Sequence, residues 1–324
     1  MGNLLTLAQK VPKKIKFILR RQKSIRELYI YPETQDGWVK HPIPLIGNKN
    51  TGSFFDPYIY CENGTFFLFV SDRKNSTIVR MKSADGISWS SAVNVLLAGD
   101  SSDWDAVVNR GCVRKIGNRW IMWYTGQSDG KSAIGVAAST DGIHFEKYKD
   151  NPILRPETRY EGCAVMNPSV LYDAQKGIYQ MWYCAGEQCE PDVICYAQST
   201  DGFHWEKHTG NPVFCSSKAT YDCAKVGGCD VFRKENGIYG MFYIGYQNID
   251  NARICYAESE NGIDHWIRSD YNPMISPGKG RWDAHAVYKP AFYYDSENNK
   301  GYLWYNGRKN INEYIGLATK VFDR

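Results

Sequence analysis

A pair of an aromatic residue and an acid recurs at equivalent points of four repeats, and a fifth acid, Asp56, lies outside this repeated motif. Two carboxyl groups facing one pocket can cleave a glycosidic bond, because one protonates the leaving oxygen while the other activates water or attacks the sugar. Asp56 is the candidate base or nucleophile, and Glu161 or Asp222 is the candidate acid. Asp105 and Asp283 are candidate substrate-binding residues at the pocket mouth. The aromatic–acid pairs are Trp104-Asp105, Tyr160-Glu161, Tyr221-Asp222 and Trp282-Asp283.

A structural interpretation of the same acids is also open. Each paired acid would then hold a loop by accepting backbone N–H bonds, and Asp56 would cap a loop in the same way. Repetition of the motif along the chain favours this interpretation for any single member.

Basic and amide side chains and one further acid, Glu187, are expected in the same pocket. The candidate substrate-binding residues of this group are Arg73, Arg110, Asn167, Glu187, Lys289 and Arg308. Cations in a pocket favour an anionic group on the substrate, such as a phosphate or a uronate. The alternative is that the cations only neutralise the neighbouring acids.

A short turn phrase recurs five times and indicates how these residues are brought together. Its copies are Thr34-Gln35-Asp36-Gly37, Ser83-Ala84-Asp85-Gly86, Ser139-Thr140-Asp141-Gly142, Ser199-Thr200-Asp201-Gly202 and Ser259-Glu260-Asn261-Gly262. A period of about 40–60 residues with several short strands per repeat is typical of β-propeller blades. The sequence therefore predicts an all-β, five-bladed propeller with four-stranded antiparallel blades.

The order of strands within a blade predicts where the chemistry lies. The first strand of a blade lines the central channel, and its start shares a rim with the end of the second strand, because the two run antiparallel. Asp56, Arg110, Asn167 and Lys289 occur at first-strand starts, whereas Arg73, Glu187 and Arg308 occur at second-strand ends. These side chains are expected to converge on one pocket.

The last repeat lacks an outer strand. The chain stops after the third strand of the fifth repeat, while residues 28–45 near the N-terminus resemble a turn and an outer strand. We expect the N-terminal segment to complete the last blade and so to remove an exposed sheet edge. The predicted organisation is an extension over residues 1–25 and a single propeller domain over residues 26–324.

Composition excludes several classes of protein. The net charge of +4 gives no electrostatic case for nucleic-acid binding. No apolar run is long enough to cross a membrane, and no secretory pattern precedes the repeats. The ten cysteines fit no zinc spacing and favour free thiols in a reducing, cytoplasmic compartment. The sequence shows no cofactor-binding loop and no metal-ligand motif, so we predict neither.

Residues 8–25 form a basic stretch with interleaved apolar side chains. One interpretation is a peripheral contact with the anionic inner face of a membrane. The other, which we favour, is a solvated or partly disordered tail.

The Phe55-Asp56-Pro57 opening of the first repeat, the Ser-x-Asp-Gly turns and the five repeats resemble the five-bladed propeller glycosidases. That superfamily includes arabinanases, β-xylosidases, invertases, levansucrases and mannoside phosphorylases, and the resemblance covers about residues 28–324. It implies a first-blade Asp, matched by Asp56, together with a second Asp and a Glu acid. Asn167-Pro168 stands where the second Asp is expected, and Glu161-Gly162-Cys163 matches the acid motif only in part.

Three functions are consistent with this pattern. The first is a glycoside hydrolase that acts with paired carboxylates. The second is glycosyl transfer or phosphorolysis in cytoplasmic polysaccharide metabolism, which the cations favour. The third is a non-catalytic glycan-binding propeller, which the Asn at position 167 favours.

Overall fold

The computed structural model describes residues 30–47, 54–187, 190–248 and 250–323. Its strands form five units of four, of which the second and third are joined by one parallel pair, Ala164 with Ser132. Blade 1 consists of β2 (Phe54–Glu62), β3 (Thr65–Asp72), β4 (Thr77–Ser83) and β5 (Val93–Leu97). Blade 2 consists of β6 (Val107–Ile116), β7 (Arg119–Ser128), β8 (Lys131–Ser139) and β9 (Glu146–Lys147).

The remaining blades repeat the same antiparallel order. Blade 3 consists of β10 (Ala164–Asp173), β11 (Ile178–Gly186), β12 (Pro191–Ser199) and β13 (Glu206–Lys207). Blade 4 consists of β14 (Lys225–Arg233), β15 (Tyr239–Asn248), β16 (Asn251–Ser259) and β17 (Ile267–Arg268). Blade 5 consists of β18 (Ala286–Asp295), β19 (Lys300–Lys309), β20 (Asn312–Val321) and β1 (Val39–Lys40). One 3-10 turn, η1 (Arg159–Glu161), is the only helix in the described ranges.

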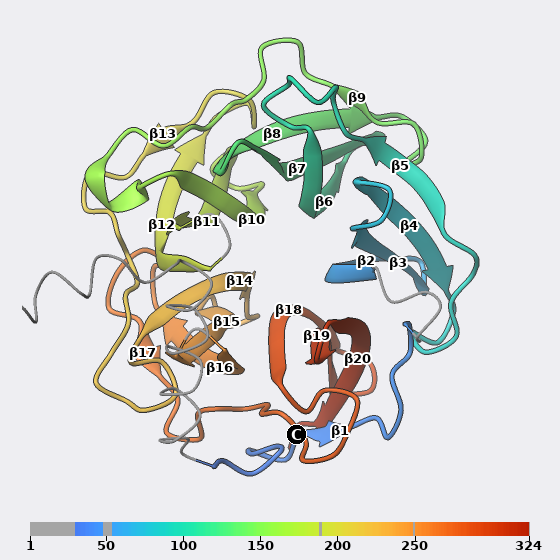
Figure 1. The fold of residues 1–324 in the computed structure, drawn as a ribbon, viewed down its shortest axis with the longest axis vertical. Coiled ribbons are helices and arrows are strands. Elements are labelled where there is room, and N and C mark those ends of the chain that lie inside the picture. Colours follow the sequence, from blue (N-terminus) through green and yellow to red (C-terminus); the bar gives the residue numbers. More distant parts are fainter. Residues whose placement is uncertain (1–29, 48–53, 188–189, 249, 324) are drawn as a thin grey trace, which may run out of the picture. The chain divides into compact units, whose positions relative to one another are not determined.

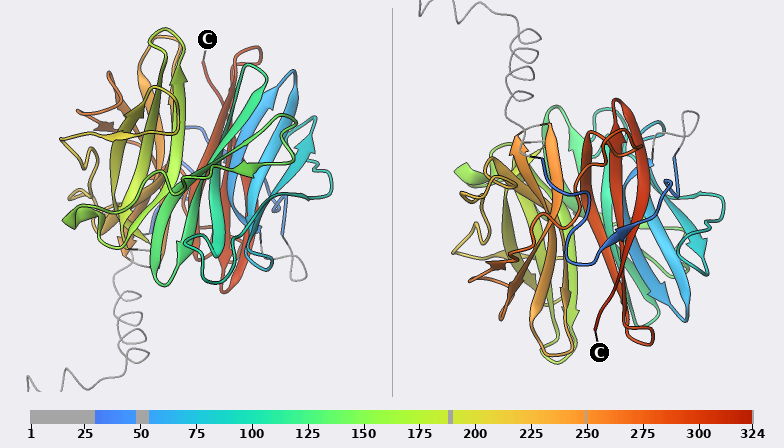
Figure 2. Two further views of the ribbon diagram at one scale, coloured as in Figure 1. Left: turned by 90° about the horizontal axis from the view of Figure 1, so that it is seen from above. Right: turned by 90° about the horizontal axis from the view of Figure 1, so that it is seen from below.

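The five blades surround a common axis, with β2, β6, β10, β14 and β18 innermost (Figure 1). In the side views the sheets of neighbouring blades lie side by side (Figure 2). The predicted five-bladed, all-β propeller is therefore confirmed.

The N-terminal segment completes blade 5. Strand β1 pairs antiparallel with β20, with Val39 opposite Thr319. This pairing confirms the predicted closure, and it leaves β20 without an open edge at that position. Pro32–Arg324 form one compact unit, whereas the predicted extension over residues 1–25 lies outside the described residues. Among the described residues, no helix is long and apolar enough to cross a membrane.

The repeated turn phrase has one structural role in every copy that follows β4, β8, β12 and β16. The Ser83 hydroxyl accepts a hydrogen bond from the Gly86 N–H at 2.8 Å, and Asp85 Oδ1 accepts from Ile87 N–H at 2.8 Å and Ser88 N–H at 2.7 Å. The same contacts recur at Ser139, Ser199 and Ser259. Hydrogen bonds from the backbone lower the pKa of Asp85 below its usual range. Such side-chain-to-backbone bonds fix the tight turn that reverses the chain between the third and fourth strands of each of these blades.

Candidate active site

Each inner strand carries one bulge, and the bulge residue has a left-handed backbone. The five residues are equivalent by register and have φ of 56° at Asp56, 57° at Arg110, 54° at Asn167, 51° at Gly228 and 48° at Lys289. Side chains other than glycine rarely adopt this conformation, so it must be held in place by its surroundings. The bulge therefore places one selected residue per blade near the axis.

The neighbouring blade holds most of these bulges. The backbone N–H of Asp56 donates to Asn306 Oδ1 at 3.3 Å, that of Arg110 to Ser71 Oγ at 2.9 Å, and that of Asn167 to Thr125 Oγ1 at 3.0 Å. The N–H of Gly228 donates to Cys184 Sγ at 2.9 Å. All four acceptors occupy the same position on the second strand of the preceding blade. The axial side chains are thus positioned by a ring of hydrogen bonds between blades.

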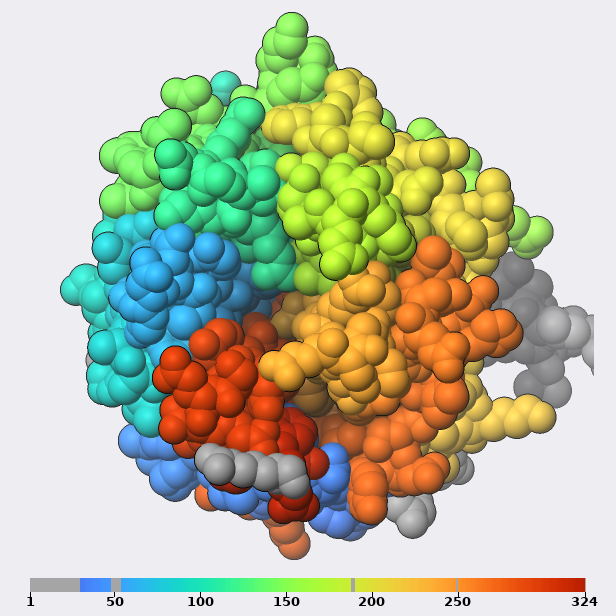
Figure 3. All heavy atoms as spheres, turned by 180° about the vertical axis from the view of Figure 1, so that it is seen from behind, coloured from blue at the N-terminus to red at the C-terminus, as the bar shows by residue number. Residues whose placement is uncertain are grey.

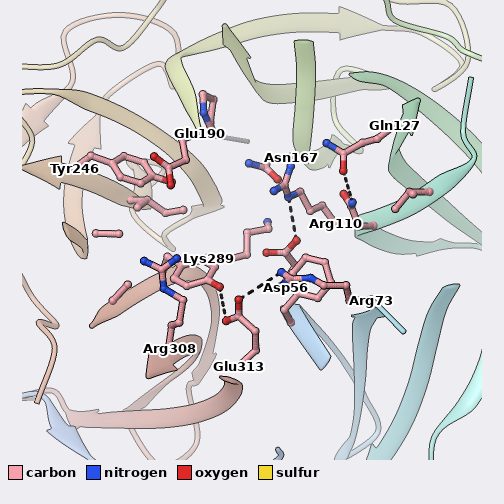
Figure 4. A pocket seen from close by; sticks show the side chains of 18 of the residues that line it. Asp56, Arg73, Arg110, Gln127, Asn167, Glu190, Tyr246, Lys289, Arg308 and Glu313 are labelled. Atoms are coloured by element: carbon pink, nitrogen blue, oxygen red, sulfur yellow. Dashed lines mark hydrogen bonds and ion pairs between the residues drawn. The ribbon is translucent and has the colours of Figure 1, made fainter. Parts of the chain in front are cut away.

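A cavity of about 330 Å³ opens at this end of the axis. Asp56, Arg110, Asn167 and Lys289 line it from four blades, joined by second-strand and third-strand residues of the same rim (Figure 4). These additional lining residues include Arg73, Gln127, Glu190, Tyr246, Arg308 and Glu313. The structure therefore brings together six of the predicted site residues, namely Asp56, Arg73, Arg110, Asn167, Lys289 and Arg308.

Asp56 is buried and forms an ion pair with Arg110, with 2.9 Å between Oδ2 and Nε. Burial acts to lower the pKa of Arg110, but Asp56 raises it above its usual value. This charged guanidinium faces Asp56 directly across the ion pair. Asp56 is therefore suited to accept a proton or to attack an electron-poor carbon.

Glu313 is a further buried acid of the rim, beside Asp56 and Asp72, but its oxygens are already bound. Tyr288 OH donates to it at 2.5 Å, Asn306 Nδ2 donates at 2.6 Å, and Arg73 pairs with it at 3.4 Å. Arg73 also stacks over the Phe55 ring at 4.4 Å. Since Asn306 contacts both Glu313 and the Asp56 backbone, this network positions Asp56 rather than offering a second free acid.

Glu190 and Asp250 are the two acids of the cavity that each have a buried carboxyl oxygen without a hydrogen-bond partner among the described residues. Burial raises the pKa of Glu190 to about 7, although Arg308 and Lys225 act to lower it. Its Oε2 atom is buried and has no hydrogen-bond partner among the described residues. A carboxyl group that holds its proton near neutral pH is the form that a general acid needs. Glu190 and Asp56 approach the cavity from different blades (Figure 4).

Two cations of the cavity form no ion pair in the part of the chain that the structure describes. Lys289 is 3% exposed and forms no hydrogen bond or ion pair there. The Arg308 side chain also lines the cavity, and its Nε is buried without a hydrogen-bond partner among the residues that the structure describes. An unpaired buried charge is costly, so both groups are suited to meet an anion that enters the cavity.

The four acids of the repeated aromatic–acid pairs lie away from the axial cavity, inside their blades. Each accepts a hydrogen bond from a tyrosine of the second strand, and the distances are 2.9 Å for Asp105, 3.0 Å for Glu161, 3.0 Å for Asp222 and 3.2 Å for Asp283. Each also pairs with a cation from the outer strand: Lys147 at 2.7 Å, Lys207 at 2.9 Å, Arg268 at 2.7 Å and Lys40 at 2.6 Å, in the same order. None of the four lines the axial cavity. The structure therefore corrects the predicted placement of Asp105, Glu161, Asp222 and Asp283 at the pocket mouth.

The physical reason is clearest at Glu161. Burial acts to raise the pKa of Glu161, but hydrogen bonds from Glu157 N–H and Lys207 lower it below its usual range. A general acid must hold a proton, and this environment removes it. Each of these acids instead ties an inter-blade loop to the outer strand of its sheet.

Glu187 also lies away from the cavity lining. Its side chain is 67% exposed and pairs with Lys225 at 2.8 Å. Lys225 also donates to the Glu190 carbonyl at 3.0 Å and pairs with Asp192 at 2.9 Å. Glu187 therefore helps to hold the segment that carries Glu190.

A substitution separates the structural role of Glu161 from a catalytic one. We expect Glu161→Ala to lower the free energy of unfolding by about 3–5 kcal/mol, because it leaves Lys207 without its buried partner. Urea unfolding measures this loss, and turnover per folded molecule should remain within about threefold of wild type. A large loss of turnover without destabilisation would return Glu161 to the catalytic site.

Glu190 and Glu313 were not identified from the sequence. Both lie at or next to the start of a third strand, Glu190 before β12 and Glu313 in β20. Third strands start on the rim where second strands end, so the same antiparallel rule could have identified them. The sequence-based prediction already placed Glu187, three residues before Glu190, at this rim.

Comparisons with known proteins agree with the fold. The model for the glycosyl hydrolases family 32 N-terminal domain matches residues 79–226. The Mycobacterium tuberculosis (strain CDC 1551 / Oshkosh) protein MT1551, which is described as uncharacterized, is 28% identical over 66% of this chain and 71% of its own length.

Solved structures extend the likeness over nearly the whole chain. The structure of a protein described as a glycoside hydrolase is 18% identical, covers 96% of this chain and 96% of its own, and has a TM-score of 0.71. The β-1,2-mannobiose phosphorylase from Listeria innocua is 14% identical, covers 92% and 93% of the two chains, and has a TM-score of 0.64. These structures share the propeller fold, and the matching family model adds support to the predicted resemblance to the five-bladed propeller glycosidases.

Proposed function

We propose that this protein is a carbohydrate-active enzyme that cleaves a glycosidic bond in the axial cavity, with Glu190 as general acid and Asp56 as base or nucleophile. One observation carries the proposal: two carboxyl groups in the same cavity have opposite environments. Asp56 faces a guanidinium at 2.9 Å, whereas burial raises the pKa of Glu190 to about 7. Pairs of acids in opposite protonation states are the basis of glycoside hydrolysis.

The roles follow from these environments. Protonated Glu190 would donate its proton to the glycosidic oxygen as the bond to the leaving sugar breaks. Asp56 would take a proton from the attacking water, or would attack the anomeric carbon itself. Glu190 replaces Glu161 and Asp222 as the acid in this proposal, because both of those side chains are held inside their blades.

Asn167 has a different role from the second Asp that the superfamily resemblance implies. It lines the cavity, is 3% exposed, and its Oδ1 is buried without a hydrogen-bond partner among the described residues. An amide oxygen in this state can accept a hydrogen bond from a sugar hydroxyl. We assign Asn167 to substrate binding, together with Arg110.

The second candidate function is phosphorolysis or glycosyl transfer, and the unpaired cations favour it. Lys289 and Arg308 would hold an anion, either as a group on the carbohydrate or as a phosphate that replaces water as the attacking group. A sugar phosphate produced inside a cell would conserve the energy of the glycosidic bond. The Glu190 role is the same in both candidates.

Turnover assays distinguish these functions. The protein is incubated with a panel of 4-nitrophenyl furanosides and pyranosides, with and without phosphate. Release of nitrophenol without phosphate supports hydrolysis, and release only with phosphate supports phosphorolysis. Saturable binding without any turnover would support the non-catalytic glycan-binding propeller and would contradict our proposal.

Substitution of the two cations tests the anionic group. We expect Lys289→Met and Arg308→Met each to weaken the binding of the anionic substrate by about 10- to 100-fold, since each removes a charge-assisted hydrogen bond. The measurement is KM for phosphate, or kcat/KM for a uronate-bearing glycoside, as a function of ionic strength. Lys176→Met, which changes a side chain 67% exposed outside the cavity, is the matched control. Unchanged salt dependence in both cavity variants would rule out an anionic ligand there.

The cytoplasmic location remains a prediction. The proposed contact of residues 8–25 with the inner membrane face falls outside the described residues.

A further inference from the structure

One boundary between blades lacks a contact that three others share. The indole Nε1 of Trp123 donates to Gly202 O at 2.9 Å, that of Trp182 to Gly262 O at 2.6 Å, and that of Trp304 to Gly86 O at 2.9 Å. In each case a second-strand tryptophan bonds to the turn glycine of the next blade. Between blades 1 and 2, Arg80 Nη1 supplies the equivalent bond to Gly142 O at 2.7 Å.

Phe242 occupies the tryptophan position in blade 4, as its register opposite Asp230 shows. The Phe242 ring has no N–H group that could donate to the carbonyl oxygen of Gly37, the turn glycine of blade 5. A Cβ placed on Gly86 would meet Trp304 at 2.7 Å, and one on Gly262 would meet Trp182 at 3.0 Å. A Cβ on Gly37 would meet only Lys320, at 3.9 Å. The boundary between blades 4 and 5 is therefore less filled than the others.

A cavity of about 600 Å³ occupies this boundary, larger than the axial one. We call it the boundary cavity, and its aromatic lining residues are Trp38, Phe232, Phe242, Tyr256, Phe292, Tyr294 and Phe322. The rings contact one another, with centroids 4.4 Å apart for Phe232 and Phe292 and 4.9 Å for Phe242 and Tyr256. On the face seen in Figure 3, the golden β14–β15 segment lies directly beside the red C-terminal strands that border this cavity. Its size falls within the range of small-molecule sites.

The rim of the boundary cavity is polar, and its charges largely cancel. Asp36 pairs with Lys320 at 2.8 Å, Lys234 pairs with Glu258, and Tyr256 OH donates to Glu258 at 2.7 Å. Arg233, Glu235 and Asp323 also line the cavity, together with Asn236 and Asn299, so that acids and cations are present in nearly equal number. This balance favours a neutral ligand over an ion.

We infer that the boundary cavity binds one ring of a neutral saccharide, with its apolar face on the aromatic side chains and its hydroxyls on the charged rim. Flat aromatic rings with a polar edge suit a ligand that is apolar on its faces and polar around its circumference. A hydrophobic protein surface fits less well, because it would remove water from two ion pairs without replacing their hydrogen bonds. Sugar hydroxyls can replace that water. The site is separate from the axial cavity, and the two cavities share no lining residue.

Restoring the missing tryptophan tests this inference. We expect Phe242→Trp to fill the cavity and to weaken saccharide binding by about tenfold or more, with turnover at the axis unchanged. The probes are mannobiose, xylobiose, arabinobiose and lactose, measured by saturation-transfer NMR in the Asp56→Asn background so that no substrate is consumed. A melting temperature equal to or above that of the parent shows that Phe242→Trp folds.

Phe232→Ala is the second variant and removes one ring without filling the space. We expect it to weaken binding of the same probe by about tenfold, while Trp182→Phe, which alters another blade boundary, leaves binding unchanged. The inference is overturned if none of the four probes gives a transfer signal outside the axial cavity. It is also overturned if binding persists in both Phe242→Trp and Phe232→Ala.

Discussion

Asp56→Asn is expected to reduce kcat by about 10²- to 10⁴-fold, the range for loss of a positioned general base. If Asp56 acts instead as the nucleophile, turnover should fall below detection, because an amide cannot form the glycosyl intermediate. Asparagine has nearly the same shape and tolerates the left-handed backbone at this bulge. The backbone bond to Asn306 is therefore preserved, and the loss reports on the carboxylate itself. The measurement is single-turnover cleavage of the best 4-nitrophenyl glycoside.

The variant leaves Arg110 as a buried cation without its partner, so its stability must be measured alongside its activity. The double variant Asp56→Asn/Arg110→Met removes that charge and should recover stability without recovering turnover. Asp264→Asn, which changes a half-exposed acid away from the cavity, should behave like wild type in both measurements. Retained turnover in Asp56→Asn would exclude Asp56 from the chemistry.

The fold could be predicted from the sequence because it is encoded by local chemistry repeated five times. Each Ser-x-Asp-Gly phrase specifies a tight turn through hydrogen bonds among adjacent residues, as at Ser83 and Asp85. The missing outer strand could be located because the only unmatched turn and strand lie at the N-terminus. Neither prediction required knowledge of distant contacts.

The proposed general acid could not be predicted in the same way, because the repeated aromatic–acid pairs pointed to residues that lie outside the axial cavity. Asp105, Glu161, Asp222 and Asp283 recur because every one of those blades needs the same bond between a tyrosine, an acid and an outer-strand cation. The proposed chemistry instead uses positions at which the equivalent residues of the five blades differ. At the five bulges the blades carry Asp, Arg, Asn, Gly and Lys, and only one of these is an acid.

The burial of Glu190 also could not be predicted from the sequence. Its raised pKa depends mainly on burial, and Tyr246 and Arg308 border the same cavity from blades 4 and 5. A glutamate in a polar segment between two strands carries no local sign of such burial. The superfamily resemblance pointed to a glutamate acid, and our proposal assigns that role to Glu190, which lies outside the expected motif.

Glu190→Gln is expected to lower kcat for a substrate with a poor leaving group by about 10²- to 10⁴-fold, because glutamine has no proton to donate. In the wild type, activity should fall as pH rises through about 7, since Glu190 loses its proton there. Measurement of kcat/KM between pH 4 and pH 9 should show this alkaline limb, and the variant should lack it. A dinitrophenyl glycoside, whose leaving group needs no acid, should be cleaved at nearly the wild-type rate.

The same shift predicts a sign for stability. The folded protein holds the Glu190 proton more tightly than the unfolded chain does, so this group favours folding below the unfolded pKa and that contribution is lost as pH rises through about 7. Glu190→Gln should therefore be more stable than wild type at pH 8, with little difference at pH 4. Glu206→Gln is the matched control, because it changes an exposed glutamate outside the cavity and should leave the alkaline limb in place. If the limb persists in Glu190→Gln, the acid is another group and the proposed mechanism fails, whereas loss of the limb in Glu190→Gln alone identifies Glu190 as the proton donor.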